Sequence, residues 1–173
     1  MNKAILYGMT ALAMGATVAG CTNKRAATTP PPVADNNNPA GTALEDSVDL
    51  VELPQMQADL IAKAGSDTVY FATDASLLDN PARATLAAQA RWMLANTNVR
   101  ASIEGHADER GTREYNLALG ERRANAAKQF LIANGVPEGR LTTISWGKEK
   151  PVALGSNEQA WAQNRRAVTV IVR

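Results

Sequence analysis

The chain has 173 residues, which is enough for one domain of ordinary size with extensions. Its 18 basic residues balance its 17 acidic ones, so the chain has no charge excess of the kind that binds nucleic acid. The single cysteine excludes an internal disulfide and a cysteine-rich zinc site, and the single histidine gives histidine-based catalysis one candidate.

Residues 1–20 have the pattern of a secretory signal peptide. Lys3 supplies a positive charge, and the apolar run that follows is too short for a comfortable membrane span. The run ends in Val-Ala-Gly-Cys, which resembles the bacterial lipobox and implies that Cys21 is acylated to form a membrane anchor. An ordinary signal peptide with a chance cysteine is the alternative. The familiar inner-membrane retention signal is an aspartate after the cysteine, so Thr22 implies the outer membrane.

Residues 21–53 are predicted to be the lipidated cysteine and a disordered tether. They show no apolar period, and residues 28–32 and 35–39 are rich in proline, threonine and asparagine. A coil of this length spans roughly 30 Å on average and about 100 Å when fully stretched. Residues 54–173 are predicted to form the folded domain, with a short lead-in helix at Pro54–Ala64.

The folded domain is predicted to alternate strands with helices. Alternating or β-branched runs predict the strands, and capping residues with a 3.6-residue apolar period predict the helices. The expected strands are residues 68–71, 99–104, 141–146 and 167–172, and the expected helices are about 80–95, 112–133 and 157–163. Helical crossovers imply right-handed βαβ units. We therefore expect an α+β two-layer sandwich, in which a mixed four-stranded sheet has helices packed on one face.

The helix that begins at Thr112 carries a cation within its apolar face. Arg123 lies near the middle of that face, and a buried arginine is costly unless it is paired. Asp108, in the loop before the helix, is the nearest acidic candidate. One interpretation is an internal pair that fixes the loop to the helix. The other is a ligand site, in which Asp108 takes an amine and Arg123 takes a carboxylate through a two-pronged contact.

Three consecutive motifs in this region resemble a known family. Residues 105–112 (GHADERGT), 114–116 (EYN) and 119–124 (LGERRA) are similar to the signature of OmpA-like peptidoglycan-binding domains, in the variant that peptidoglycan-associated lipoproteins carry. The resemblance extends over about residues 66–173. It implies the same two-layer fold.

The resemblance also implies a ligand and its site. The family holds the meso-diaminopimelate of the peptidoglycan stem peptide with an aspartate and an arginine at the positions of Asp108 and Arg123. The resemblance implies four further ligand-binding residues: Asp74, Thr112, Asn116 and Leu119. A turn or cap aspartate is the alternative for Asp74. Backbone amides at the helix start are expected to add anion contacts. Arg165 and Arg166 either face the ligand or form salt bridges and caps where the last strand begins.

The function implied is that of a non-catalytic outer-membrane lipoprotein that binds peptidoglycan without a cofactor. The resemblance further implies TolB and other Tol-system proteins as partners, and a role in envelope integrity and in outer-membrane constriction during division. An OmpA-like wall anchor without Tol partners is one alternative, and an ion-motor stator component is another. A wall-modifying hydrolase is the third, because a strand running past Gly105 would place Glu104, His106 and Asp108 on one side.

Overall fold

The structure, a computed structural model, describes the backbone of residues 45–172 and the side chains of residues 52–172. The predicted signal peptide, Cys21 and the first part of the predicted tether lie outside the described residues. No helix within the described range combines the length and apolar character needed to cross a bilayer.

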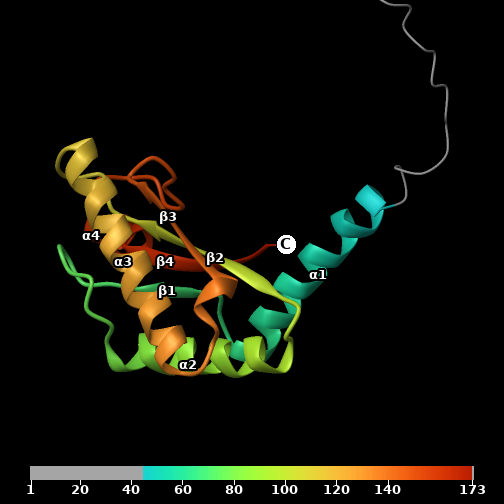
Figure 1. The fold of residues 1–173 in the computed structure, drawn as a ribbon. Coiled ribbons are helices and arrows are strands. Elements are labelled where there is room, and N and C mark those ends of the chain that lie inside the picture. The colour runs from blue at the N-terminus through green and yellow to red at the C-terminus, as the bar shows by residue number, and fades with distance from the viewer. Residues whose placement is uncertain (1–44, 173) are drawn as a thin grey trace, which may run out of the picture. The chain divides into compact units, whose positions relative to one another are not determined.

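The described chain forms one mixed sheet with helices (Figure 1). Its elements in chain order are α1 (Glu45–Ala64), β1 (Thr68–Tyr70), α2 (Asn80–Ala95), β2 (Arg100–His106), α3 (Arg113–Ala133), the 3-10 turn η1 (Glu138–Arg140), β3 (Leu141–Gly147), α4 (Glu158–Asn164) and β4 (Arg166–Val172). The strand order is β1-β4-β2-β3, with β2 parallel to β3 and the other two pairs antiparallel. The predicted mixed four-stranded sheet is confirmed.

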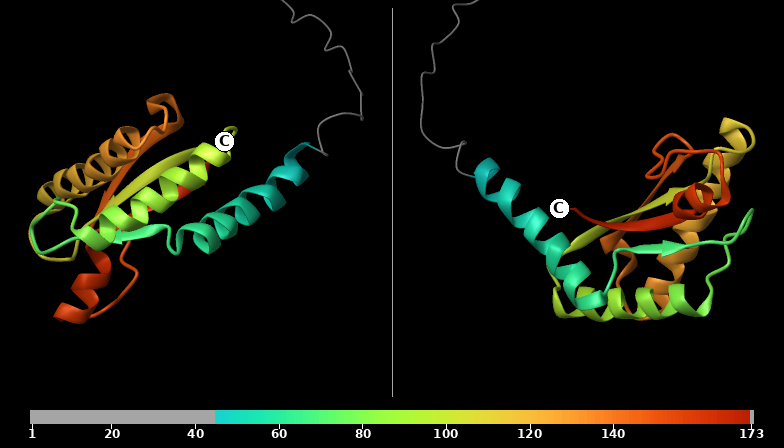
Figure 2. Two further views of the ribbon diagram at one scale, coloured as in Figure 1. Left: turned by 90° about the horizontal axis from the view of Figure 1, so that it is seen from below. Right: turned by 180° about the vertical axis from the view of Figure 1, so that it is seen from behind.

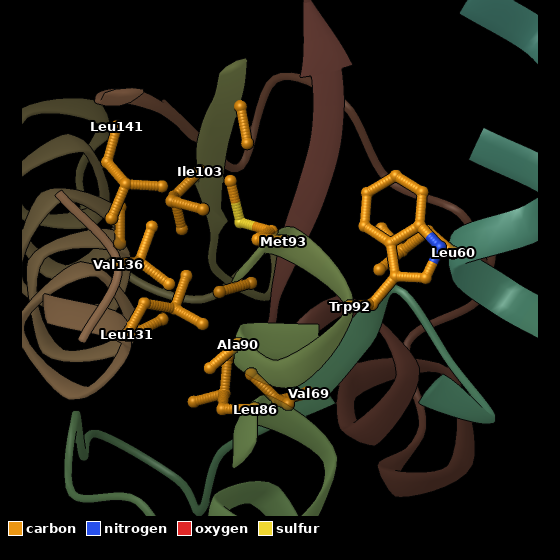
Figure 3. Close-up of a cluster of buried hydrophobic side chains, with 14 of the residues drawn as sticks. Leu60, Val69, Leu86, Ala90, Trp92, Met93, Ile103, Leu131, Val136 and Leu141 are labelled. Carbon is orange, nitrogen blue, oxygen red and sulfur yellow. The ribbon is translucent and has the colours of Figure 1, made fainter. Parts of the chain in front are cut away.

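The long helices lie on one face of this sheet. Figure 2 shows α2 and α3 side by side there, and α1 packs against α2 and β4. The strands bury alternate side chains on this face, as Ala101 and Ile103 of β2 do. These meet Leu86 and Met93 of α2 and Leu131 of α3 in a single apolar core (Figure 3).

Two element boundaries differ from the prediction by more than one residue. Helix α1 begins at Glu45 rather than at Pro54, so the end of the predicted disordered tether is helical. Leu53 packs against the core, which adds an apolar contact before the expected start. Strand β2 continues past Gly105 to His106, because its parallel partner β3 extends to Gly147 and pairs with it across a register shift.

Candidate functional site

The loop between β2 and α3 is fixed at its helical end by two side chains. Thr112 is the N-cap of α3, as predicted, and its hydroxyl accepts a hydrogen bond from the Tyr115 backbone N–H at 3.2 Å. The Asn116 amide donates to the carbonyls of Arg110 at 2.7 Å and Thr112 at 3.0 Å. Gly111 has φ +86°, which a glycine adopts without steric cost. The loop is therefore preformed.

A close approach of two glycines sets the distance from α3 to the sheet. A Cβ placed on Gly105 of β2 would lie 1.8 Å from the carbonyl oxygen of Gly120 in α3. Since any side chain at either position would push the helix away, the pair lets α3 rest directly on β2. This contact brings the first turns of α3 against the end of β2, where Arg123 and the loop meet.

Arg123 is held by main-chain carbonyls and is completely buried, with 0% of its surface exposed. Its guanidinium donates to the oxygens of Ala75 at 2.8 Å, His106 at 2.8 Å and Ala72 at 3.1 Å. Burial lowers the Arg123 pKa to about 10, which leaves the group charged at neutral pH. Arg123 thus ties residues 72–75 to the end of β2. The interpretation as an internal pair with Asp108 is wrong, because carbonyls make its hydrogen bonds.

Asp108 pairs with two other arginines. Its carboxylate accepts hydrogen bonds from Arg110 Nε at 3.1 Å and Nη2 at 2.7 Å, and Arg165 Nη1 lies 3.5 Å away. Burial opposes ionisation of Asp108, but the hydrogen bonds and charge of Arg110, together with the charge of Arg165, outweigh burial and lower its pKa. Asp108 is therefore an anion at neutral pH.

A cavity of about 290 Å³ opens above this carboxylate. Its lining consists of Thr73, Asp74, Asp108, Arg110, Gly111, Tyr115, Asn116 and Leu119. The structure therefore brings together four of the six predicted ligand-binding residues. The other two, Thr112 and Arg123, lie behind the lining. Thr112 caps the helix, and Arg123 holds residues 72–75 and the end of β2, which together we call the floor of the cavity.

Sequence reasoning missed three residues that line the cavity with charged or polar groups: Thr73, Arg110 and Tyr115. Arg110 covers Asp108, as described above. The Tyr115 hydroxyl donates a hydrogen bond to the Asp74 carboxylate across 41 positions of the chain, and this bond raises the Tyr115 pKa. Asp74 itself has φ +53°, a conformation that few residues other than glycine adopt. Arg110 lies within the GHADERGT motif and Tyr115 within the EYN motif, so these motifs were the signal that could have identified them.

Comparison with known proteins decides the family. The model of the OmpA family matches residues 70–165. A peptidoglycan-associated lipoprotein of Rhizobium meliloti is 46% identical over 94% of this chain and 86% of its own length. The chain belongs to the OmpA family. A second peptidoglycan-associated lipoprotein, from Brucella melitensis, is 45% identical over 93% of this chain and 89% of its own length.

Solved structures agree with the fold of this OmpA-family protein. The crystal structure of the peptidoglycan-associated lipoprotein from Burkholderia pseudomallei is 42% identical, has a TM-score of 0.61, and covers 62% of this chain and 92% of its own. A putative MotB-like protein from Desulfovibrio vulgaris, at 19% identity and a TM-score of 0.59 over 73% of this chain and 94% of its own, shows the shared fold alone. Peptidoglycan-associated lipoproteins of the OmpA family are non-catalytic binding proteins, so the protein is not an enzyme.

The three residues considered for a hydrolase, Glu104, His106 and Asp108, lie at two separate places in the structure. Because β2 runs past Gly105, Glu104 and His106 do come close, with His106 Nε2 3.9 Å from Glu104 Oε2. Burial, with the nearby charges of Arg166 and Lys150, lowers the His106 pKa to about 4, so the ring is neutral. The cavity of Asp108 is lined by other residues. Within the described residues, no cluster of three or more histidine, cysteine, aspartate or glutamate side chains could hold a metal.

Both arginines at the start of β4 make the salt bridges and caps of the second predicted role. Arg165 is buried beside Asp108, donates to the Phe71 carbonyl at 3.1 Å and pairs with Glu158 at 2.7 Å. Arg166 donates to the carbonyl of Lys150 at 3.1 Å, which is a capping role at the start of the strand. Of the two, Arg165 places its charge beside Asp108, although it lies outside the cavity lining.

Proposed function

We propose that this OmpA-family protein is an outer-membrane lipoprotein that binds peptidoglycan non-covalently through the meso-diaminopimelate of the stem peptide. One observation carries the proposal: the cavity places an ionised carboxylate, Asp108, among arginine charges. The end of the diaminopimelate side chain is a zwitterion, with an ammonium and a carboxylate on one carbon. Opposite charges within one small cavity fit such a group. The names of its relatives in Rhizobium and Brucella support the same ligand class.

In this proposal the two acidic residues receive the ammonium. Asp108 provides the main contact, and Asp74 lines the same cavity. Asn116 and Leu119 shape the wall, and Thr112 holds the start of α3. Arg123 acts from below the floor: its charge favours a ligand carboxylate, and it fixes the loops that form the cavity.

We also propose that acyl chains on Cys21 anchor the protein in the outer membrane, with the folded domain facing the periplasm. Several acyl chains give a durable anchor, whereas one gives marginal binding. The chain between Cys21 and α1 reaches at most about 80 Å when fully extended, which allows the domain to touch a wall away from its membrane. TolB and other Tol-system proteins are the proposed protein partners, in envelope integrity and in constriction during division.

A calorimetric titration tests the proposed ligand. The full chain, held in a non-ionic detergent, is titrated with a soluble stem peptide containing meso-diaminopimelate and, separately, with the peptide in which lysine replaces it. We expect binding to the first and at least about tenfold weaker binding to the second, because lysine lacks the carboxylate of one ion pair. Equal binding, or binding to neither peptide, would overturn the proposal. A parallel titration with purified TolB tests the protein partner separately.

A further inference from the structure

Arg110 covers the carboxylate that is proposed to receive the ligand. Its guanidinium bonds both oxygens of Asp108, and only 9% of the Asp108 side chain is exposed. An ammonium group that bonds both oxygens of Asp108 must therefore displace Arg110. The Arg110 side chain is 40% exposed, so its guanidinium can turn toward solvent without disturbing the packed core.

Arg110 has a second support that does not depend on Asp108. Its guanidinium lies over the Trp161 ring, 4.2 Å from the ring centroid. The Trp161 indole in turn donates to Glu109 at 3.0 Å, which fixes the ring. Cation–π stacking of this kind keeps a guanidinium in place when its anionic partner is replaced. Arg110 can thus leave Asp108 and stay at the edge of the cavity.

The other arginines near the cavity are committed to partners inside the protein. Arg123 is fully buried and bonds three carbonyls. Arg165 is buried and bonds the Phe71 carbonyl and Glu158. Among the lining residues of the cavity, the guanidinium belongs to Arg110. This side chain is partly exposed, and its planar pair of N–H groups suits a carboxylate.

We propose that Arg110 determines specificity for a zwitterionic ligand by exchanging its ionic partner, an inference that rests on the proposed function. The ligand ammonium replaces Arg110 on Asp108, and the carboxylate on the same ligand carbon pairs with the displaced Arg110. One internal ion pair is exchanged for two with the ligand. A ligand with an ammonium alone breaks the internal pair and leaves Arg110 without an anion. The free protein therefore resists simple amines.

Three peptides measure this selectivity in the full chain, held in a non-ionic detergent. They are the stem peptide with meso-diaminopimelate, the same peptide with the side-chain-end carboxylate converted to an amide, and the lysine peptide. We expect the wild-type protein to prefer the first by at least about tenfold, the factor that one charge-assisted contact contributes. In Arg110→Gln the preference should fall below about threefold, because Asp108 is uncovered and the carboxylate has lost its partner.

Arg113→Gln is the matched control. Arg113 also forms an ion pair, with Glu149 at 3.1 Å, but it is exposed and lies outside the cavity lining. This variant should keep the wild-type preference. Arg110→Lys, which keeps the charge and loses the planar fork, should give an intermediate value. A wild-type preference retained in Arg110→Gln would overturn this inference alone, whereas a wild-type protein that binds none of the peptides would overturn the proposed function as well.

Discussion

Arg110 lines the cavity and Arg123 lies behind its lining, and the two side chains are held in contrasting ways. Arg123 is fully buried, and three main-chain carbonyls, two from the loop after β1 and one from the end of β2, accept its hydrogen bonds. Arg110 is partly exposed and is held by a carboxylate and an aromatic ring. Carbonyls are fixed by the fold, whereas a carboxylate can exchange one cation for another. The floor of the cavity therefore provides its shape. The ion pair of Arg110 and Asp108, which we call the rim, provides its recognition chemistry.

The largest expected effect on stability comes from a substitution that disturbs the floor of the cavity. In Gly105→Ala the new methyl group would meet the Gly120 carbonyl, so α3 must move away from β2. We expect the free energy of unfolding to fall by more than about 3 kcal/mol in urea denaturation. Gly139→Ala is the control, because a Cβ there would meet no described atom within 4 Å. Similar stabilities of the two variants would show that the close approach is not required.

Removing the buried guanidinium should cost nearly as much. Arg123→Ala leaves the carbonyls of Ala72, Ala75 and His106 without their donor and opens a cavity. We expect a loss of about 3 kcal/mol in the free energy of unfolding, since unsatisfied buried groups are costly. Urea denaturation measures this loss. A loss below about 1 kcal/mol would mean that the floor does not depend on these three bonds.

His106, which supplies one of those carbonyls, should make stability depend on pH. Its side chain is 3% exposed, and burial with the charges of Arg166 and Lys150 lowers its pKa from 6.5 to about 4. Glu104, the acidic group facing it, lies 3.9 Å away. Between pH 4 and 6.5 the unfolded chain binds a proton that the folded one does not, so stability rises with pH. We expect a gain of about 2 kcal/mol across this window.

Denaturation in urea at pH 4.5 and pH 7 measures the histidine effect. His106→Gln cannot titrate, so its stability should change less between the two values than that of the wild-type protein. The pKa of Asp108 is already low, so its own contribution is lost only at more acid pH. An unchanged difference in the variant would assign the pH dependence to other groups.

The smallest expected effect concerns the rim. Arg110→Gln removes a partly exposed ion pair and leaves the floor intact. We expect the free energy of unfolding to change by less than about 1 kcal/mol, although ligand selectivity changes. A loss comparable to that of Arg123→Ala would show that rim and floor are not separate in the way their contacts indicate.

Local patterns were enough to predict most of the fold. Thr112 was predicted as an N-cap because its hydroxyl bonds a backbone group within the first turn of the same helix. The burial of Arg123 followed from its place on the apolar face of α3. The end of β2 was predicted too early, because Gly105 looked like a stop signal. Gly105 instead permits the close contact with Gly120, which lies in α3.

The partners of the charged groups could not be predicted from the sequence. Main-chain carbonyls carry no sequence signature, so the hydrogen bonds from Arg123 to the carbonyls of Ala72 and Ala75 could not be predicted. The stacking of Arg110 on Trp161 joins residues of separate elements. The resemblance to the OmpA family indicated which residues gather at the site. It did not indicate that Arg110 covers Asp108 in the free protein.

The most direct test of the account is the affinity of Asp108→Asn for the meso-diaminopimelate stem peptide, measured by calorimetry beside the wild-type protein. Asparagine keeps the shape of the side chain and removes the charge that is proposed to hold the ammonium. The account predicts a loss of at least about thirtyfold in affinity, in a variant that still unfolds cooperatively in urea. Wild-type affinity in a folded Asp108→Asn protein would contradict the account, because the ligand would then be bound without the carboxylate on which the site is built.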